Sequence, residues 1–139
     1  KLAFEVLQSK MQGNAADIKG PVIMATVEGD IHDIGKNIVK VVLESYGYEV
    51  IDLGKNVPVQ EVVDAYLKYQ PKAIGLSALM TTTVVSMKKT IEALRQYADV
   101  PPIMVGGAGL TQDIADEIGA DYYGEDAMAT VKIMQKILP

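Results

Sequence analysis

The sequence predicts an α/β protein with a doubly wound, five-stranded parallel sheet. From residue 20 onward, short runs of apolar and β-branched residues alternate with segments of helical periodicity. Each interval is long enough for a crossover, which parallel strands require and which is right-handed in a sheet. About half of the 139 residues are apolar (49%), which is enough to form one buried core.

The five predicted strands share a short length, an excess of valine and isoleucine, and turn residues on either side. They cover residues 22–27, 49–53, 73–77, 102–105 and 121–123. A parallel sheet is covered on both faces, so its strands are expected to be apolar throughout rather than alternating.

Helical periodicity fills the intervals between these strands. The clearest helix follows Pro58, which the first turn of a helix tolerates, and has the apolar positions Val59, Val62, Val63, Tyr66 and Leu67. The segment after the first strand has Ile34, Ile38, Val41, Val42 and Ser45 on one face, and also Val39 and Leu43. Its apolar arc is therefore broad, and we expect it to lie deep in the fold. Three further helices are marked by Val84, Met87, Ile91 and Leu94, by Ile114, Ala115 and Ile118, and by Ala127, Val131, Met134 and Leu138.

Residues 1–19 are predicted to form a lead-in helix and linker ahead of a single domain over residues 20–139. Leu2, Val6 and Leu7 have helical spacing, and Gly13-Asn14 is a turn signal. Because the first residue is lysine rather than methionine, we expect the chain to belong to a longer protein.

Composition excludes several classes of function. The net charge is −5 without a basic tract, so no nucleic-acid partner is expected. No cysteine is present, which excludes disulfides, thiolate zinc sites and cysteine nucleophiles. No apolar run is long enough for a membrane span, and the N-terminus lacks a signal peptide, so we expect no membrane partner and a cytoplasmic location.

In a doubly wound sheet, ligands bind outside the carboxyl ends of the strands, and the first such loop has no nucleotide-binding motif. Five residues separate Gly29 from Gly35, one more than a Walker A loop has, and Asn37 follows Lys36 where that motif needs a hydroxyl. No GxGxxG is present. A phosphorylated receiver domain would need an aspartate where the third strand ends in Ser77.

The same loop contains Asp30-x-His32, the one histidine of the chain. A carboxylate that binds one imidazole nitrogen orients the ring and makes the other nitrogen a better metal ligand. An isolated pair of this kind is more often a surface histidine beside an aspartate that caps the next helix. Zinc would need more ligands than one imidazole, so a single histidine suits a cofactor that brings its own metal.

Small residues follow the neighbouring strands, and they indicate a slot. Gly75 lies inside a strand that is otherwise apolar, where glycine often marks the close approach of a ligand. Hydroxyl side chains follow at Ser77 and at residues 81–83, and the fourth strand ends in a glycine-rich run at residues 106–109. A long, flat ligand would fit such a slot.

Three elements in this order resemble the signature of cobalamin-binding domains. Asp30-x-His32-x-x-Gly35 is followed after 41 residues by Ser77-x-Leu79, and after 26 more by Gly106-Gly107. The match extends over roughly residues 20–137. Within that group the sequence is similar to methyltransferase corrinoid proteins: the cobalamin domain of methionine synthase and the small carriers of methanol, methylamine and aryl-ether demethylation systems. The implied fold is the Rossmann-like, flavodoxin-like cobalamin-binding domain.

The resemblance implies a base-off, His-on corrinoid. The benzimidazole of the cofactor would leave cobalt and enter the slot, and His32 would bind cobalt from below. Asp30 would hold the other imidazole nitrogen, and Thr83 would continue this relay at a position where the family usually has serine. Family positions that contact the cofactor correspond to Gly29, Asp30, Ile31, His32, Asp33, Gly35, Ser77, Leu79, Thr81, Gly106, Gly107 and Ala127.

The function implied is that of a methyl carrier rather than a stand-alone enzyme. Cobalamin would alternate between cob(I)alamin and methylcobalamin, while a substrate methyltransferase, an acceptor methyltransferase and a reductive activator would be partners. The alternatives are the small subunit of an adenosylcobalamin-dependent mutase, a cobalamin-binding sensor module, or a doubly wound domain without a cofactor. Carriers of this family have a helical cap before the sheet domain, and only residues 1–13 could belong to one here.

Overall fold

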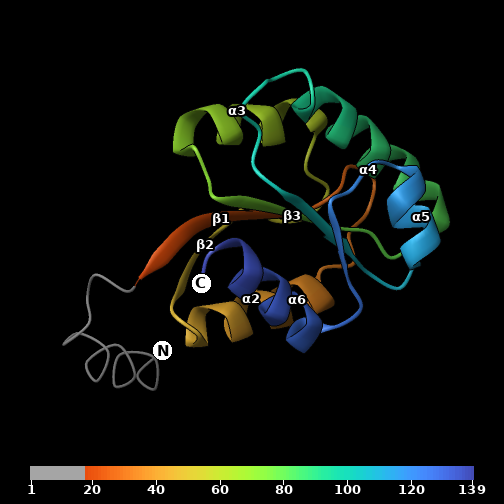
Figure 1. Cartoon of the computed structure of the whole chain (residues 1–139). Coiled ribbons are helices and arrows are strands. Elements are labelled where there is room, and N and C mark those ends of the chain that lie inside the picture. The colour runs from red at the N-terminus through yellow and green to blue at the C-terminus, as the bar shows by residue number, and fades with distance from the viewer. Residues whose placement is uncertain (1–17) are drawn as a thin grey trace.

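The computed structural model describes residues 18–139, and it contains one sheet with helices on both faces (Figure 1). The predicted lead-in helix and most of the linker, residues 1–17, lie outside the described residues. The boundary at residue 20 therefore stays a prediction.

Strands and helices alternate along the chain. They are β1 (Lys19–Thr26), α2 (Ile34–Ser45), β2 (Tyr48–Asp52), α3 (Val59–Tyr69), β3 (Ala73–Ser77), α4 (Thr81–Leu94), β4 (Ile103–Gly106), α5 (Gln112–Glu117), β5 (Tyr122–Gly124) and α6 (Ala127–Ile137). All five predicted strands are present, with small shifts at their ends. The longest helix, α4, has 14 residues, and no helix in the described part of the chain is long and apolar enough to cross a membrane.

The sheet has the order β2-β1-β3-β4-β5, and every neighbouring pair is parallel. Helices α3, α4 and α5 cover one face, and α2 and α6 cover the other (Figure 1). The predicted doubly wound fold is therefore confirmed. The strand order reverses between β1 and β3, which places the switch point, and the expected ligand site, at the carboxyl ends of these two strands.

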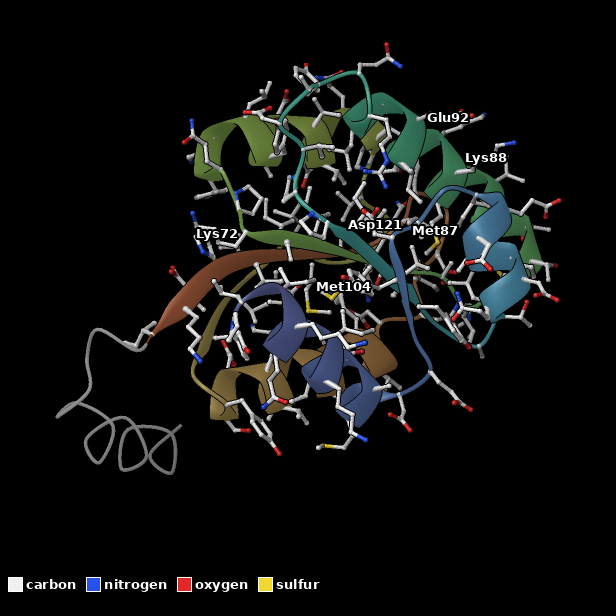
Figure 2. All side chains as sticks on the ribbon, in the orientation of Figure 1. Lys72, Met87, Lys88, Glu92, Met104 and Asp121 are labelled. Atoms are coloured by element: carbon white, nitrogen blue, oxygen red, sulfur yellow. The ribbon has the colours of Figure 1, made fainter. Side chains whose placement is uncertain are left out.

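The sheet separates two apolar clusters. The larger one lies under α3, α4 and α5 and includes Ile23, Ile74 and Met87. The smaller one lies under α2 and α6 and includes Leu43 and Met104. Figure 2 shows Met87 and Met104 on opposite sides of the sheet. Such burial is the main favourable contribution to folding.

The expectation that α2 lies deep in the fold is wrong. On the predicted apolar face, Ile34 is 76% exposed, Ile38 53% and Val41 48%. The buried face instead includes Lys36 and Leu43. On this buried face Leu43 packs in the smaller apolar cluster and Lys36 pairs with Asp52 at the end of β2, and periodicity alone does not contain these tertiary contacts.

Candidate functional site

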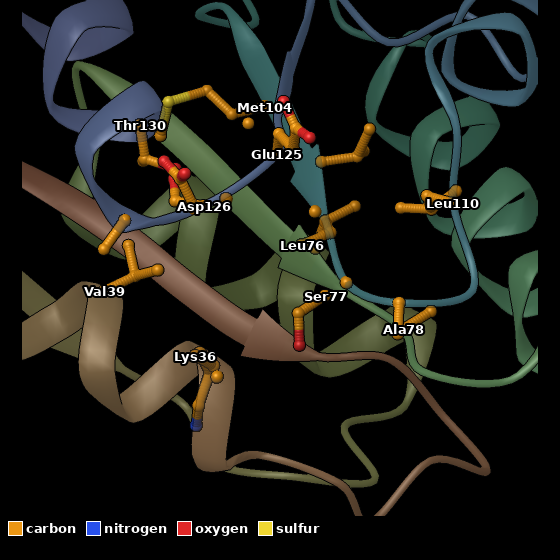
Figure 3. A pocket seen from close by; sticks show the side chains of 18 of the residues that line it. Lys36, Val39, Leu76, Ser77, Ala78, Met104, Leu110, Glu125, Asp126 and Thr130 are labelled. Atoms are coloured by element: carbon orange, nitrogen blue, oxygen red, sulfur yellow. The ribbon is translucent and has the colours of Figure 1, made fainter.

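A pocket of about 610 Å³ opens at the carboxyl ends of β1, β3 and β4. Lys36 and Val39 of α2 and Thr130 of α6 face the ends of β3 and β4 around this space (Figure 3). The predicted site residues that line it are His32, Gly35, Ser77, Leu79, Gly106, Gly107 and Ala127. The pocket thus joins the loop that contains His32 to the predicted slot.

The loop between β1 and α2 is held by hydrogen bonds to the loop after β2. Gly29 has a φ of +89°, a conformation that glycine adopts without strain. Its N–H donates to Asn56 Oδ1 over 2.8 Å, and the N–H of Asn56 donates to the carbonyl of Asp30 over 2.9 Å. The backbone that places Asp30 and His32 is therefore fixed from a neighbouring loop.

Asp30 is fully buried, and its carboxylate connects two loops. Oδ1 accepts from the backbone N–H of His32 over 3.0 Å and from His32 Nδ1 over 2.8 Å. Oδ2 accepts from the N–H of Leu79 over 2.8 Å and from Thr83 Oγ1 over 2.6 Å. Asp30 therefore does not cap α2, and the common structural explanation for this aspartate is wrong.

Burial alone would raise the pKa of Asp30, because a carboxylate loses hydration inside a protein. The hydrogen bonds from Thr83, His32 and Leu79 outweigh burial and hold this pKa well below its usual range. Asp30 is consequently ionised at neutral pH, and its carboxylate accepts a hydrogen bond from the N–H at Nδ1 of His32.

This arrangement defines the chemistry available to His32. A neutral imidazole with its proton on Nδ1 has a free electron pair on Nε2. The His32 side chain is 45% exposed, and Nε2 has no hydrogen-bond partner among residues 18–139. His32 therefore has the tautomer and the exposure of a metal ligand whose other nitrogen is held by a carboxylate.

A second ion pair lies beside the pocket. Lys36 Nζ, on a side chain that is 1% exposed, donates to Asp52 Oδ1 over 2.5 Å and to the carbonyl of Gly54 over 3.0 Å. Burial would raise the pKa of Asp52, but the hydrogen bond and charge of Lys36, with the N–H of Gly54, lower it. This pair attaches the first turn of α2 to the end of β2.

Packing within the fold explains part of the glycine-rich run at the end of β4. A Cβ atom on Gly107, whose φ is +123°, would lie 2.0 Å from the carbonyl oxygen of Ala78. One on Gly106 would lie 3.0 Å from the carbonyl oxygen of Gly124. The chain's own packing therefore requires Gly107, so this glycine is weaker evidence for a ligand than the sequence suggested.

The structure places the other predicted site residues apart from the pocket wall. Ile31 is 63% exposed, and Thr81 is exposed at the start of α4. Asp33 is the N-cap residue of α2, but its side chain makes no capping hydrogen bond. Thr83 is buried and reaches Asp30 rather than the pocket, so of the hydroxyl residues noted at Ser77 and at residues 81–83 only Ser77 lines the pocket.

Sequence reasoning missed several residues that line the pocket. They come from the sheet face, from the helices α2 and α6, and from the loop before α6: Met24, Lys36, Met104, Glu125, Asp126 and Thr130. Residues 124–126 lie at the carboxyl end of the last strand, where ligands bind in such sheets, so their position in the sequence could have indicated them. For Met24 and Met104 the only signal is strand alternation, which does not say which face holds a ligand.

The model of the B12 binding domain family matches residues 20–132. Dimethylamine corrinoid protein 3 of Methanosarcina mazei is 43% identical over 129 residues, which cover 91% of this chain and 77% of that protein. Trimethylamine corrinoid protein 1 of Methanosarcina acetivorans is 43% identical over 139 residues, which cover 97% of this chain and 64% of that protein. The chain is thus shorter than these relatives.

Solved structures agree with this assignment. A cobalamin-binding protein of Desulfitobacterium hafniense is 36% identical, with a TM-score of 0.86 over 99% of this chain and 68% of that one. A chain of the methanol:cobalamin methyltransferase complex of Methanosarcina barkeri is 40% identical, with a TM-score of 0.81 over 85% of this chain and 46% of that one. A chemotaxis response regulator of Vibrio cholerae, at 19% identity and a TM-score of 0.61 over 85% of this chain and 98% of that one, shares the fold alone.

These comparisons confirm the predicted resemblance, and they confirm cobalamin as the cofactor at the level of the family. Because the family model matches most of the described residues, the assignment concerns the domain that contains His32 and the pocket. The chain belongs to the B12-binding domain family.

Proposed function

We propose that this chain is a methyl-carrying corrinoid protein in which His32 Nε2 binds the cobalt of a base-off cobamide. The observation that carries the proposal is the unpartnered Nε2 at the mouth of a pocket, on a ring whose Nδ1 is held by buried Asp30. When bound, the corrinoid supplies a cobalt that can accept and donate a methyl group. The protein contributes ligation and orientation.

The residues of the pocket fit such a cofactor. Gly35 lies beside His32, and a Cβ atom there would meet nothing within 4 Å, which leaves free space next to the imidazole. The pocket then continues along β3 past Ser77, between α2 and α6. A nucleotide tail that leaves cobalt would have a route from the face of His32 into the protein.

Asp30 and Thr83 act on His32 in this proposal. Asp30 keeps the imidazole proton on Nδ1, so that Nε2 is available as a ligand, and its negative charge makes that nitrogen more basic. Thr83 donates to the same carboxylate and fixes its orientation. Asp30 and Thr83 are therefore positioning residues rather than groups that contact the methyl group.

The partners we propose are a substrate methyltransferase, an acceptor methyltransferase and a reductive activator. Two observations support methyltransferase partners. The relatives are dimethylamine and trimethylamine corrinoid proteins, and a similar chain is part of a methanol:cobalamin methyltransferase complex. Ile31, Ile34, Leu79 and Met80 are exposed, and they follow the carboxyl ends of β1 and β3. In a carrier, partners must approach over this same edge of the sheet.

Mixing the protein with hydroxocobalamin, desalting and recording the visible spectrum tests this proposal. We expect retained colour and a spectrum that differs from the free, base-on cofactor. His32→Ala should bind more weakly and lose that difference, whereas Asp64→Asn, at an exposed position of α3 outside the pocket lining, should keep it. An identical spectrum in wild type and His32→Ala would remove His32 from the metal.

A further inference from the structure

The position of His32 depends on Asp30. Among residues 18–139, His32 donates two hydrogen bonds, one from its backbone N–H over 3.0 Å and one from Nδ1 over 2.8 Å, and both end on Asp30 Oδ1. The neighbouring Ile31 is 63% exposed, so packing contributes little to holding this part of the loop. Any movement of Asp30 therefore changes where His32 Nε2 points.

Asp30 itself is held from two different loops. Its carboxylate accepts from the N–H of Leu79 and from Thr83 Oγ1, at the start of α4. Its backbone is held from the loop after β2, because the N–H of Asn56 donates to the carbonyl of Asp30 over 2.9 Å. The side chain of Asn56 accepts from the N–H of the preceding residue, Gly29, over 2.8 Å. Asn56 thus fixes the backbone of the residue whose carboxylate holds the imidazole.

The backbone of Asn56 is anchored on both sides. The N–H of Val57, which is 2% exposed, donates to the carbonyl of Thr26 over 3.0 Å. The carbonyl of Gly54 accepts from the N–H of Thr26 over 2.9 Å and from Lys36 Nζ over 3.0 Å. Asn56 has a φ of +51°, in the left-handed region that asparagine enters more readily than most residues. Its side chain is therefore held over Gly29 by a fixed stretch of backbone.

The hydrogen bond from Gly29 to Asn56 has little to do for the core. Both residues are exposed, and neither belongs to the two apolar clusters. Water can satisfy an exposed donor or acceptor, so losing such a bond costs little stability compared with leaving a buried group unsatisfied. The effect of the Asn56 side chain is therefore expected in the geometry of the loop rather than in the stability of the fold.

We propose that Asn56 is a positioning residue for the metal-binding imidazole. By holding Gly29 and Asp30 in place, it keeps the carboxylate of Asp30 on Nδ1 and leaves Nε2 free at the mouth of the pocket. This inference rests on the proposed function, in which Nε2 binds cobalt. Asn56 lies outside the three sequence elements that indicate cobalamin binding, and it acts through Asp30 without touching the cofactor.

Three variants of the full chain test the inference. Asn56→Gly removes the acceptor Oδ1, while it keeps the backbone N–H that binds Asp30 and tolerates the positive φ. Asn56→Asp keeps an oxygen acceptor on a side chain of the same shape, and aspartate also tolerates this φ. Lys55→Ala is the matched control, because Lys55 is the exposed neighbour on the same loop.

The first measurement needs no cofactor. His32 is the one histidine of the chain, so ¹⁵N-histidine labelling gives the nitrogen resonances of a single imidazole. With the ring neutral, wild type should show two well-separated resonances, for protonated Nδ1 and bare Nε2. In Asn56→Gly we expect the two to move toward each other, because a looser Asp30 lets both tautomers form. Asn56→Asp and Lys55→Ala should match wild type.

The second measurement is hydroxocobalamin binding followed by visible absorbance. We expect Asn56→Gly to bind roughly tenfold more weakly and to show a smaller His32-dependent spectral change, since losing a partner that orients a metal-binding histidine typically has such an effect. Asn56→Asp should restore both. An equal loss in Asn56→Asp would contradict a role for the acceptor oxygen.

These outcomes separate the inference from the proposed function. If wild type retains no cobalamin, the proposed function fails, and the nitrogen resonances alone decide whether Asn56 positions His32. If wild type binds and Asn56→Gly is indistinguishable from it in both measurements, only the inference fails. Thermal unfolding without ligand should place the midpoint of Asn56→Gly within a few degrees of wild type. A large fall in this midpoint with unchanged nitrogen resonances would assign Asn56 a structural role and overturn the inference.

Discussion

Thr83 shows how much a single side chain contributes to the candidate site. Its hydroxyl donates to Asp30 Oδ2 over 2.6 Å in a buried position, and its Cγ2 would lie 3.5 Å from a Cβ on Gly29. The resemblance leads us to expect serine here, and threonine has the same hydroxyl donor. The relay from Thr83 through Asp30 to His32 is therefore geometrically complete.

Thr83→Val preserves the shape of the side chain and removes the donor to Asp30. A lost hydrogen bond to a buried charge is expected to lower the free energy of unfolding by about 1.5–3 kcal/mol. Thr83→Ser is the matched control, since it keeps the hydroxyl and loses only a methyl group. Urea unfolding of both variants measures the difference. Equal stability of Thr83→Val and wild type would show that this hydrogen bond has no net effect.

Among the helices, α2 is attached to the end of β2 by the buried Lys36–Asp52 pair. Asp52 has a lowered pKa in the folded protein, against an ordinary value of 3.8. Between these two values the unfolded chain binds a proton that the folded chain does not bind. The contribution of Asp52 to stability is therefore complete above pH 3.8 and is lost as the pH falls toward the folded pKa.

Asp52→Asn removes this contribution. At neutral pH we expect a loss of about 3 kcal/mol, because buried Lys36 would lose its nearest countercharge and keep only Asp33, whose Oδ2 lies 3.9 Å from Nζ. Below pH 3.8 the difference from wild type should shrink, as protonation removes the same charge from the wild-type protein. Chemical unfolding across pH 2–7 measures both effects, with exposed Asp64→Asn on α3 as the control. A difference independent of pH would contradict this linkage.

In the whole molecule, the pocket is lined by residues of α2, α6 and the four strands β1, β3, β4 and β5, so a ligand there would contact segments from both halves of the chain. A ligand that binds only the folded state stabilises it by about 2.7 kcal/mol at a free concentration of one hundred times its dissociation constant. Hydroxocobalamin at that ratio should raise the midpoint of thermal unfolding by several degrees. Circular dichroism at 222 nm measures this midpoint. At the same cobalamin concentration, His32→Ala should show a smaller rise, and no rise in wild type would argue against binding.

Much of the fold was predictable from the sequence because each strand and helix has its own local signal. The run over residues 73–77 is apolar and bounded by turn residues, and β3 has those limits. Alternation of strands and helices then restricts the topology to a parallel sheet with crossovers. The orientation of α2 was not predictable, because the Lys36–Asp52 contact is tertiary.

The candidate site was likewise predictable only in part. The family signature and the proximity of Asp30 to His32 are legible in the sequence, since residues two apart on a tight loop are neighbours in any fold. The burial of Asp30 and the hydrogen bond from Thr83, 53 residues away, come from the folded arrangement. So does the row that Met24, Gly75 and Met104 form on neighbouring strands in the pocket. These contacts join segments that are far apart in the chain, so they depend on how the strands pair and how the helices pack on the sheet.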